Sequence, residues 1–177
     1  MRFTDMSDNI IPIVKLRALE PEDLDILYRI ENDTTLWDAG CTNVPYSRYT
    51  LHNYIADSTN DIYTDKQLRL MIENAEGEDV GIIDMMNFDP RHQRAEVGVV
   101  VMRRFRRRGY ATAAVKELLG YALKTLNLHQ LYVFVDSNNA GSIRLFSSVG
   151  FSKTAVLSQW LRIGKDYHDA ILMQYFL

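Results

Sequence analysis

The chain has a single cysteine, Cys41, among its 177 residues, so no disulfide can form within it. A lone thiol suits a reducing compartment, and the sequence therefore favours a cytoplasmic location. No apolar run approaches the roughly 20 residues that a membrane-spanning helix needs. The first ten residues contain Asp5 and Asp8 and lack the apolar core of a signal peptide. We therefore expect no membrane association and no secretion.

The chain also lacks a strong charge of either sign, because its formal net charge is -3 and its sequence pI is about 5.8. These values argue against a broad basic face for nucleic acid. The charge is uneven, however: residues 17–38 hold seven acids and two bases, and five of the six residues in 103–108 are arginine. The length fits one domain, which we assign to residues 13–177, with residues 1–12 as an N-terminal extension.

Hydrophobic periodicity and turn residues predict alternating strands and helices. Helices are expected after Glu20-Pro21-Glu22-Asp23, over residues 47–57 with Ser47 as cap, over 110–126, and between Asn139 and Gly150. Strands are expected at residues 13–19, 68–72, 80–88, 95–102, 131–135, 151–161 and 167–176. The apolar run 131–135 predicts a strand in the sheet centre covered on both faces. We therefore predict a three-layer α/β domain with a mixed, mostly antiparallel sheet and helices on both faces.

The arginine-rich segment 103–112 lies between a predicted strand and a predicted helix. Backbone N–H groups are free at a helix N-terminus, and the small residues Gly109 and Ala111 let an anion approach them closely. Arginines add charge-assisted hydrogen bonds to phosphate. A solvated basic loop or a nucleic-acid patch is the alternative interpretation of such a run. The segment lacks the Walker pattern and the dinucleotide fingerprint.

Arg106-x-x-Gly109-x-Ala111 resembles the Gln/Arg-x-x-Gly-x-Gly/Ala signature of the GNAT N-acetyltransferases. Downstream, residues 135–146 resemble the second motif of that family, and Gly150-Phe151 matches the dipeptide that closes it. The resemblance covers residues 13–177 and is nearest to the ribosomal-protein alanine and spermidine acetyltransferases. It implies a GNAT-type fold, and acetyl-CoA as co-substrate with its pyrophosphate held by loop amides.

The resemblance also implies which residues bind the cofactor. These are the backbone of the strand before the loop, the loop itself and the start of the following motif. The predicted cofactor-binding residues are Val99, Val100, Val101, Arg106, Arg107, Arg108, Gly109, Tyr110, Ala111, Thr112, Asn139 and Ser142. Asn139 has a second interpretation as a helix cap. In that strand Gly98 is compatible with a bulge.

An alkylammonium must lose a proton before its nitrogen attacks a thioester, so the reaction needs a base. Glu96 is the candidate catalytic base, because the resemblance places a carboxylate on the strand that precedes the cofactor loop. The alternative is a surface carboxylate or an ion pair with Arg94. The four histidines have no metal-ligand spacing, and we expect no metal.

Phe146 departs from the family, because many relatives have a tyrosine at this position that protonates the leaving thiolate. Ser142, Ser147 or Tyr167 would have to replace its hydroxyl, unless the thiolate leaves without an acid. We treat Cys41 as inert and consider Trp37 and Tyr46 as possible pocket residues or core.

The expected function is transfer of acetyl from acetyl-CoA to a primary amine, by direct attack in a ternary complex. Small amines, polyamines and protein N-termini are the candidate acceptors. The acidic stretch 17–38 would steer a cation. Polyamine-acetylating relatives nevertheless have more carboxylates before Pro45-Tyr46 and a glutamate where Asn87 stands, which argues against spermidine. A non-catalytic CoA-binding regulatory module is the alternative function, and a homo-oligomer is a family-level expectation.

Overall fold

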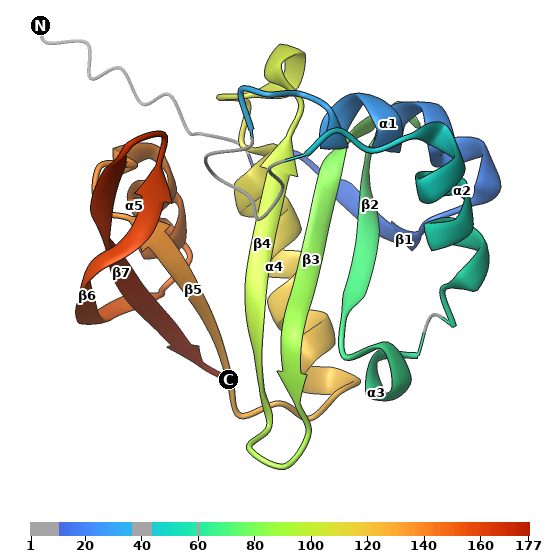
Figure 1. Ribbon diagram of the computed structural model, residues 1–177. Helices are drawn as coiled ribbons and strands as arrows, with labels where there is room; N and C mark the ends of the chain where they lie inside the picture. Colours follow the sequence, from blue (N-terminus) through green and yellow to red (C-terminus); the bar gives the residue numbers. More distant parts are fainter. Residues whose placement is uncertain (1–10, 37–43, 60) are drawn as a thin grey trace, which may run out of the picture.

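The computed structural model describes residues 11–36, 44–59 and 61–177. Within these residues seven strands form one sheet in the order β1-β2-β3-β4-β5-β7-β6 (Figure 1). Neighbouring strands are antiparallel except β4 and β5, which run parallel. The predicted mixed, mostly antiparallel sheet is confirmed.

The strands are β1 (Val14–Ala18), β2 (Leu68–Asn74), β3 (Asp79–Asp89), β4 (Arg94–Val101), β5 (Gln130–Asp136), β6 (Ser152–Ile163) and β7 (Asp166–Phe176). The α-helices are α1 (Leu24–Glu31), α2 (Arg48–Asp57), α3 (Ile62–Asp65), α4 (Tyr110–Lys124) and α5 (Ala140–Ser148). Single turns of 3-10 helix occupy Pro21–Asp23 and Arg103–Phe105.

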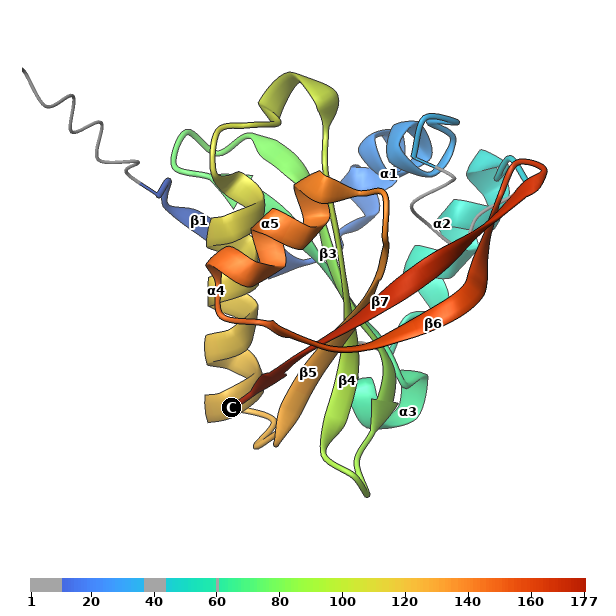
Figure 2. The same cartoon turned by 90° about the vertical axis from the view of Figure 1, so that its left-hand side faces the viewer.

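Helices cover both faces of the sheet, as Figure 2 shows. On one side, which we call the α4 face, α4 buries Ala114, Val115 and Leu118 completely against the apolar side of the strands. On the other side, the α1 face, Ile26 and Ile30 of α1 pack with Met71 and Ile82 of β2 and β3. The three-layer architecture that the sequence predicts is therefore confirmed.

Two predicted helix caps are confirmed by their hydrogen bonds. The Ser47 side chain accepts a hydrogen bond from the Thr50 amide, 3.0 Å away, at the start of α2. The Asn139 side chain accepts from the Ser142 amide at 3.0 Å at the start of α5. Each cap satisfies one of the amides that a helix N-terminus leaves free.

The acids at the start of α1 have a structural role. Asp23 is 5% exposed, and its carboxylate receives hydrogen bonds from Arg17 at 2.7 and 2.9 Å and from the Glu20 amide at 2.8 Å. Burial raises the pKa of Asp23, but these donors outweigh it and hold the pKa below its ordinary value. Asp23 therefore fixes the chain between β1 and α1 and is not available to attract a substrate.

The expectation that β5 is covered on both faces is wrong. Leu131, Val133 and Val135 are buried on the α4 face, whereas Tyr132 and Phe134 on the α1 face are only half-buried. The cause lies outside the strand, because α1 covers the α1 face over β2 and β3 rather than over β5. A run of apolar residues does not reveal how far the covering helices extend.

The bulge that Gly98 suggested is also absent. The register of β3 and β4 is continuous from Gly81 and Val101 to Met86 and Glu96, with Gly98 opposite Asp84. The irregularity lies beyond it, where Asn87 adopts a left-handed conformation with φ of 49°. A Cβ atom on residue 98 would lie 3.1 Å from the Met86 methyl carbon, so the glycine leaves room for Met86.

Candidate active site

The central feature of the sheet is the separation of β4 from β5. The two parallel strands pair only from Arg94 with Gln130 to Glu96 with Tyr132. Beyond this point they diverge, and Figure 1 shows β4 and β5 moving apart toward the end of the sheet where β4 leads into the arginine-rich loop. Residues 97–101 of β4 therefore pair with β3 alone, and their backbone groups on the β5 side have no partner from β5. Val99, Val100 and Val101 lie in this segment.

The arginine-rich loop ends at the N-terminus of α4, which makes it an anion site by geometry. Gly109 occupies the cap position with φ of 84°, and no side chain caps the helix. The first intrahelical bond near this end runs from the Ala113 amide to the Gly109 carbonyl at 3.0 Å. The amides of Tyr110, Ala111 and Thr112 therefore precede the ladder, where amides lack an intrahelical acceptor. These free donors and the helix dipole favour a phosphate.

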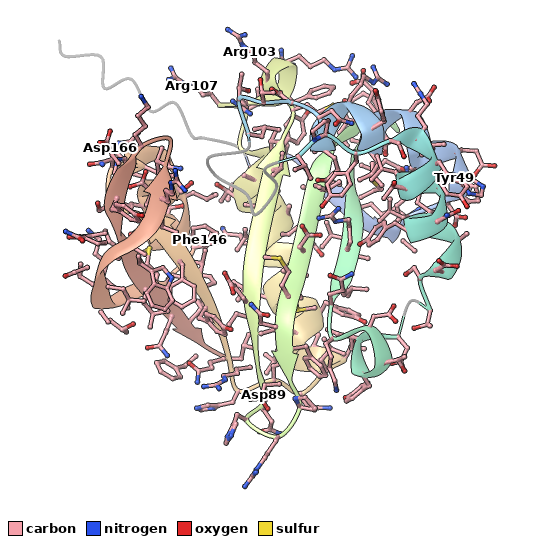
Figure 3. All side chains as sticks on the ribbon, in the orientation of Figure 1. Tyr49, Asp89, Arg103, Arg107, Phe146 and Asp166 are labelled. Atoms are coloured by element: carbon pink, nitrogen blue, oxygen red, sulfur yellow. The ribbon has the colours of Figure 1, made fainter. Side chains whose placement is uncertain are left out.

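The loop is anchored by Phe105, which is 5% exposed and packs edge-on against Tyr110 with ring centroids 6.0 Å apart. The guanidinium groups of Arg104 and Arg108 lie over the same ring at 4.5 and 5.9 Å. Arg106 donates from Nε to the Val101 carbonyl at 2.9 Å, so it ties the loop to the end of β4. Figure 3 shows Arg103 and Arg107 projecting from this end of the molecule.

Asn139 and Ser142 lie at the start of α5, just past the end of β5. The Asn139 side chain and the Ser142 amide bond to each other, which confirms the capping role. Whether they also contact the cofactor remains a prediction, supported by their position directly after the strand that borders the separation.

Glu96 lies at the point where the two strands part. Its carboxylate accepts a hydrogen bond from the Asn87 side-chain amide at 2.7 Å. Arg94 pairs instead with Asp89 at 3.4 Å, so the alternative ion pair between Glu96 and Arg94 does not form. Asn87 thus supplies a neutral donor that holds the carboxylate in place.

A second carboxylate on the α1 face is already neutralised. Asp84 receives hydrogen bonds from Arg69 at 2.7 and 3.0 Å, and the same guanidinium pairs with Glu31 at 2.5 Å. All three side chains are largely buried. Sequence analysis missed this cluster, because its members come from α1, β2 and β3 and share no motif. Glu96 thus accepts from a neutral amide, whereas the Asp84 carboxylate is paired with a guanidinium.

Phe146 lies on α5 and is 3% exposed. Its ring packs edge-on against Phe151 with centroids 5.1 Å apart, within the core of the α4 face. The phenylalanine therefore fills an apolar site, and Tyr167, considered as a replacement, is 61% exposed on β7.

A histidine and aspartate pair that sequence analysis missed lies beside the turn between β5 and α5. His168 Nδ1 is 3.1 and 3.2 Å from the two carboxylate oxygens of Asp136. Partial burial raises the pKa of Asp136, but hydrogen bonds from the Asn138 amide and His168 outweigh it, so the pKa lies below its ordinary value. The pair joins β7 to the turn that carries Asn139. Only the strand register shows that Asp136 and His168 are neighbours.

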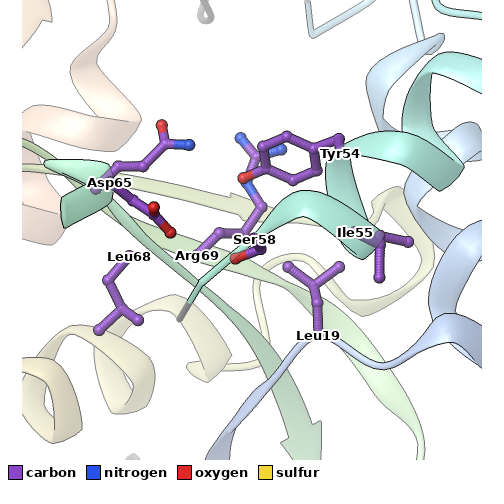
Figure 4. Close-up of a pocket in the computed structure, with 8 residues that line it drawn as sticks. Leu19, Tyr54, Ile55, Ser58, Asp65, Leu68 and Arg69 are labelled. Atoms are coloured by element: carbon purple, nitrogen blue, oxygen red, sulfur yellow. The ribbon is translucent and has the colours of Figure 1, made fainter. Parts of the chain in front are cut away.

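Figure 4 shows a small cavity that lies apart from the separated strands, with Tyr54, Asp65 and Arg69 among its lining residues. Its volume is about 20 Å³, enough for roughly one water molecule and too small for an amine substrate. A larger open hollow of about 350 Å³ is lined by residues that include Asp23, Asp79 and Arg104. Asp23 and Asp79 both pair with Arg17, so neither carboxylate is free for a ligand.

Among the described residues no group of three or more His, Cys, Asp or Glu side chains is arranged to hold a metal ion. Within the same residues, no helix is long and apolar enough to cross a membrane. Cys41, Trp37 and the stretch 39–43 lie outside the described residues, as does the segment 1–10. Tyr46 is tied to the end of α1 through its backbone, which exchanges hydrogen bonds of 2.9 and 3.1 Å with the Asn32 side chain.

Known sequences that resemble this chain are N-acetyltransferases. The family described as acetyltransferase (GNAT) domain matches residues 14–152. The chain is 29% identical over 163 residues to the spermidine N(1)-acetyltransferase of Escherichia coli (strain K12), covering 92% of this chain and 86% of the relative. It is 27% identical over 158 residues to the uncharacterized N-acetyltransferase p20 of Bacillus licheniformis, covering 88% and 84%.

Solved structures resemble the fold along nearly the whole chain. The spermidine N-acetyltransferase from Vibrio cholerae in complex with CoA and spermine superposes with a TM-score of 0.81 at 24% identity, covering 92% of this chain and 95% of that one. A dodecameric structure of the Vibrio cholerae enzyme gives a TM-score of 0.77 at 24% identity, covering 92% and 93%. These similarities establish the fold.

The loop geometry predicts that Gly109→Leu weakens CoA binding by at least about tenfold, equivalent to about 1.4 kcal/mol. A side chain at this left-handed position would stand beside the free amides and keep phosphate away from them. The measurement is titration calorimetry with CoA on protein shown to be folded. Gly77→Leu is the matched control, because Gly77 has φ of 77°, with open space around it, in a distant turn.

A Cβ atom at residue 109 would also approach the Pro12 ring to 2.8 Å, so Gly109→Leu could act by displacing Pro12. The double variant Pro12→Gly with Gly109→Leu removes that contact, and its CoA affinity should remain as low as that of Gly109→Leu alone. CoA affinity equal to that of the parent in folded Gly109→Leu would show that phosphate does not sit on these amides.

Proposed function

The chain belongs to the acetyltransferase (GNAT) domain family, and we propose that it moves the acetyl group of acetyl-CoA to a primary amine held on the α1 face. The observation that carries this proposal is the separation of β4 and β5 between a free helix N-terminus at one end and Glu96 at the other. A long cofactor with a diphosphate at one end and a thioester at the other suits such a path.

In this proposal the amides at the start of α4 bind the pyrophosphate, with Arg107 and Arg108 adding positive charge. The β5-side backbone of residues 97–101 then forms strand-like hydrogen bonds with the amide-containing arm of CoA. Backbone donors that are fixed before binding need little reorganisation when the cofactor binds. They therefore fix the orientation of the thioester as well as its position.

The chemical step follows from direct attack in a ternary complex. Glu96 takes a proton from the ammonium, directly or through water, and the freed nitrogen lone pair attacks the thioester carbonyl carbon. The attack gives a tetrahedral intermediate, and its nitrogen loses a second proton to water. Collapse of the intermediate restores the carbonyl and breaks the carbon–sulfur bond, and the electron pair leaves on sulfur. Backbone N–H groups of β4 that face β5 are placed to donate to the carbonyl oxygen as it gains negative charge.

The leaving group does not require a tyrosine hydroxyl. A thiol has a reference pKa near 8.5, so the CoA thiolate is far less basic than an alkoxide and departs without a strong acid. Phe146 is therefore compatible with turnover, and water supplies the final proton.

A small cationic amine is the acceptor class that we propose, with spermidine the first to test because relatives bear that name. Two features of the sequence argue against spermidine. The loop before Pro45 has few carboxylates, and Asn87 stands where the polyamine-acetylating relatives have a glutamate. We also expect a cytoplasmic location and assembly of several copies, as in the dodecameric Vibrio cholerae enzyme.

The direct test is an assay of free CoA release with acetyl-CoA and a panel of amines. The panel contains spermidine, 1,4-diaminobutane, n-butylamine and a short peptide with a free N-terminus. We expect turnover with at least one amine by the unmodified chain. Binding of acetyl-CoA without turnover of any amine, together with a gain of turnover in Phe146→Tyr, would instead identify a CoA-binding regulatory module.

Replacing Glu96 by glutamine should lower kcat/KM by about 10²–10⁴-fold, the usual cost of losing a general base. The substitution keeps the size of the side chain and its ability to accept from Asn87, so CoA affinity should not change. The readout is the pH profile of kcat/KM with the best amine of the panel. Asp89→Asn is the control, because Asp89 also lies on the β3–β4 unit but pairs with Arg94. A Glu96→Gln profile that overlays the parent would show that Glu96 is structural.

A further inference from the structure

A row of aromatic side chains lies on the α1 face next to Glu96. Tyr132 is in register with Glu96 across the β4–β5 pair, so the two side chains share a face of the sheet. Phe134, two residues along β5, points to the same face, and its ring centroid is 5.7 Å from that of Tyr132. Trp160 of β6 continues the row, with its ring centroid 6.1 Å from that of Phe134 and the planes inclined by 30°. We call Tyr132, Phe134 and Trp160 the aromatic row.

Trp160 is held in this position by a local distortion of β6. The pairing of β6 with β7 is regular at Leu157 and resumes at Leu161, and the three residues between them bulge out of the ladder. Within the bulge, Gln159 has φ of 52°, and its amide donates to the Asp169 carboxylate at 2.8 Å. Strand bulges commonly re-aim a side chain, and this one directs an indole across β7 toward β5.

The row is exposed at its Trp160 end and partly covered along β5, which distinguishes it from the fully buried core. Trp160 is 60% exposed, and Tyr132 and Phe134 are half-buried, while the alternate residues of β5 are buried on the α4 face. Figure 2 shows the β6–β7 hairpin bending toward the side of the sheet that carries α1 and α2. The row therefore lies on the face from which, under the proposed function, the amine approaches.

Carboxylates border the row and set its charge preference. Burial raises the pKa of the Tyr132 hydroxyl, and the neighbouring Glu96 carboxylate raises it further, so the Glu96 charge acts directly on this end of the row. Asp136 follows Phe134 on the same face and is paired with His168. Aromatic ring faces attract cations, tryptophan most strongly, and carboxylates of the same surface add to that attraction.

We propose that the aromatic row is the acceptor subsite and that it selects an alkylamine carrying a second ammonium group. The reacting nitrogen lies near Glu96, the carbon chain lies along Tyr132 and Phe134, and the second cation rests on the faces of Phe134 and Trp160. The proposal rests on the proposed acetyl transfer and names its substrate class. It also supplies what the carboxylate-poor loop before Pro45 lacks, because ring faces replace carboxylates as the cation-binding groups.

The test compares kcat/KM for 1,4-diaminobutane with kcat/KM for n-butylamine, which has the same carbon chain and no second nitrogen. The unmodified chain should prefer the diamine. Trp160→Ala should lower that preference by about two- to fivefold, the size of a cation–π contact at a partly exposed site. Trp160→Leu keeps an apolar side chain without a ring face and should lose as much, whereas Trp160→Phe should keep most of the preference. Tyr121→Ala removes a partly exposed aromatic from α4, on the other face, and should leave the preference unchanged.

A binding readout separates this proposal from the proposed function. The chain contains two tryptophans, so Trp37→Phe leaves Trp160 as the sole indole reporter. With CoA present, its emission should change saturably at lower concentrations of 1,4-diaminobutane than of n-butylamine. The subsite is wrong, and the acetyl transfer stands, if two results are obtained together with acetylation of amines. Trp160→Ala keeps the diamine preference of the unmodified chain, and the Trp160 emission does not change when 1,4-diaminobutane is added. If no amine is acetylated while the diamine still changes the emission, the acetyl transfer is wrong, and the aromatic row binds diamines without being an acceptor subsite.

Discussion

The site depends on the interruption of one strand pair. Parallel strands normally exchange backbone hydrogen bonds along their shared length, and unpaired backbone groups inside a protein are costly. Here β4 and β5 exchange them only as far as Glu96 and Tyr132 and then separate. The sheet tolerates the loss because β4 remains paired with β3 and β5 with β7, on the outer sides of the gap. The backbone groups that face the gap are then left for a ligand, and a cofactor that offers amide groups can complete the sheet.

The elements around the gap between β4 and β5 place chemical groups at both of its ends. At one end α4 presents free amides beside arginines that Phe105 fixes in place, and at the other end Asn87 holds the Glu96 carboxylate. The proposed cofactor path thus runs between elements of the sheet and α4. In the proposed function the amine lies on the α1 face, where α1 and the Arg69 cluster occupy the β2–β3 half and leave β5 partly open. On this face Asp84 shares the Arg69 guanidinium with Glu31, whereas Glu96 accepts from the neutral Asn87 amide.

Local signals in the sequence were sufficient for most elements and for placing the arginine-rich loop at the start of α4. Ser47 and Asn139 predicted their helices because a cap acts on amides two or three residues away, and Gly109 predicted the start of α4. The regular pairing at Gly98, the one-sided burial of β5 and the position of Trp160 could not be obtained in this way. Each depends on which segment, distant in sequence, packs against the residue or strand concerned. Met86 lies beside Gly98, α1 lies over β2 rather than β5, and Phe134 lies next to Trp160 across β7. The pairing of Asp136 with His168 likewise depends on strand order.

Hydrogen exchange of backbone amides with and without saturating acetyl-CoA tests the central claim most directly. The account predicts slower exchange at the amides of residues 97–101 that face β5 and at those of residues 110–112, because the cofactor becomes their hydrogen-bond partner. The amides between β5 and β7, already paired in the sheet, should change little. Bound acetyl-CoA that leaves exchange at residues 97–101 and 110–112 unchanged would contradict the account, since the cofactor would then lie elsewhere.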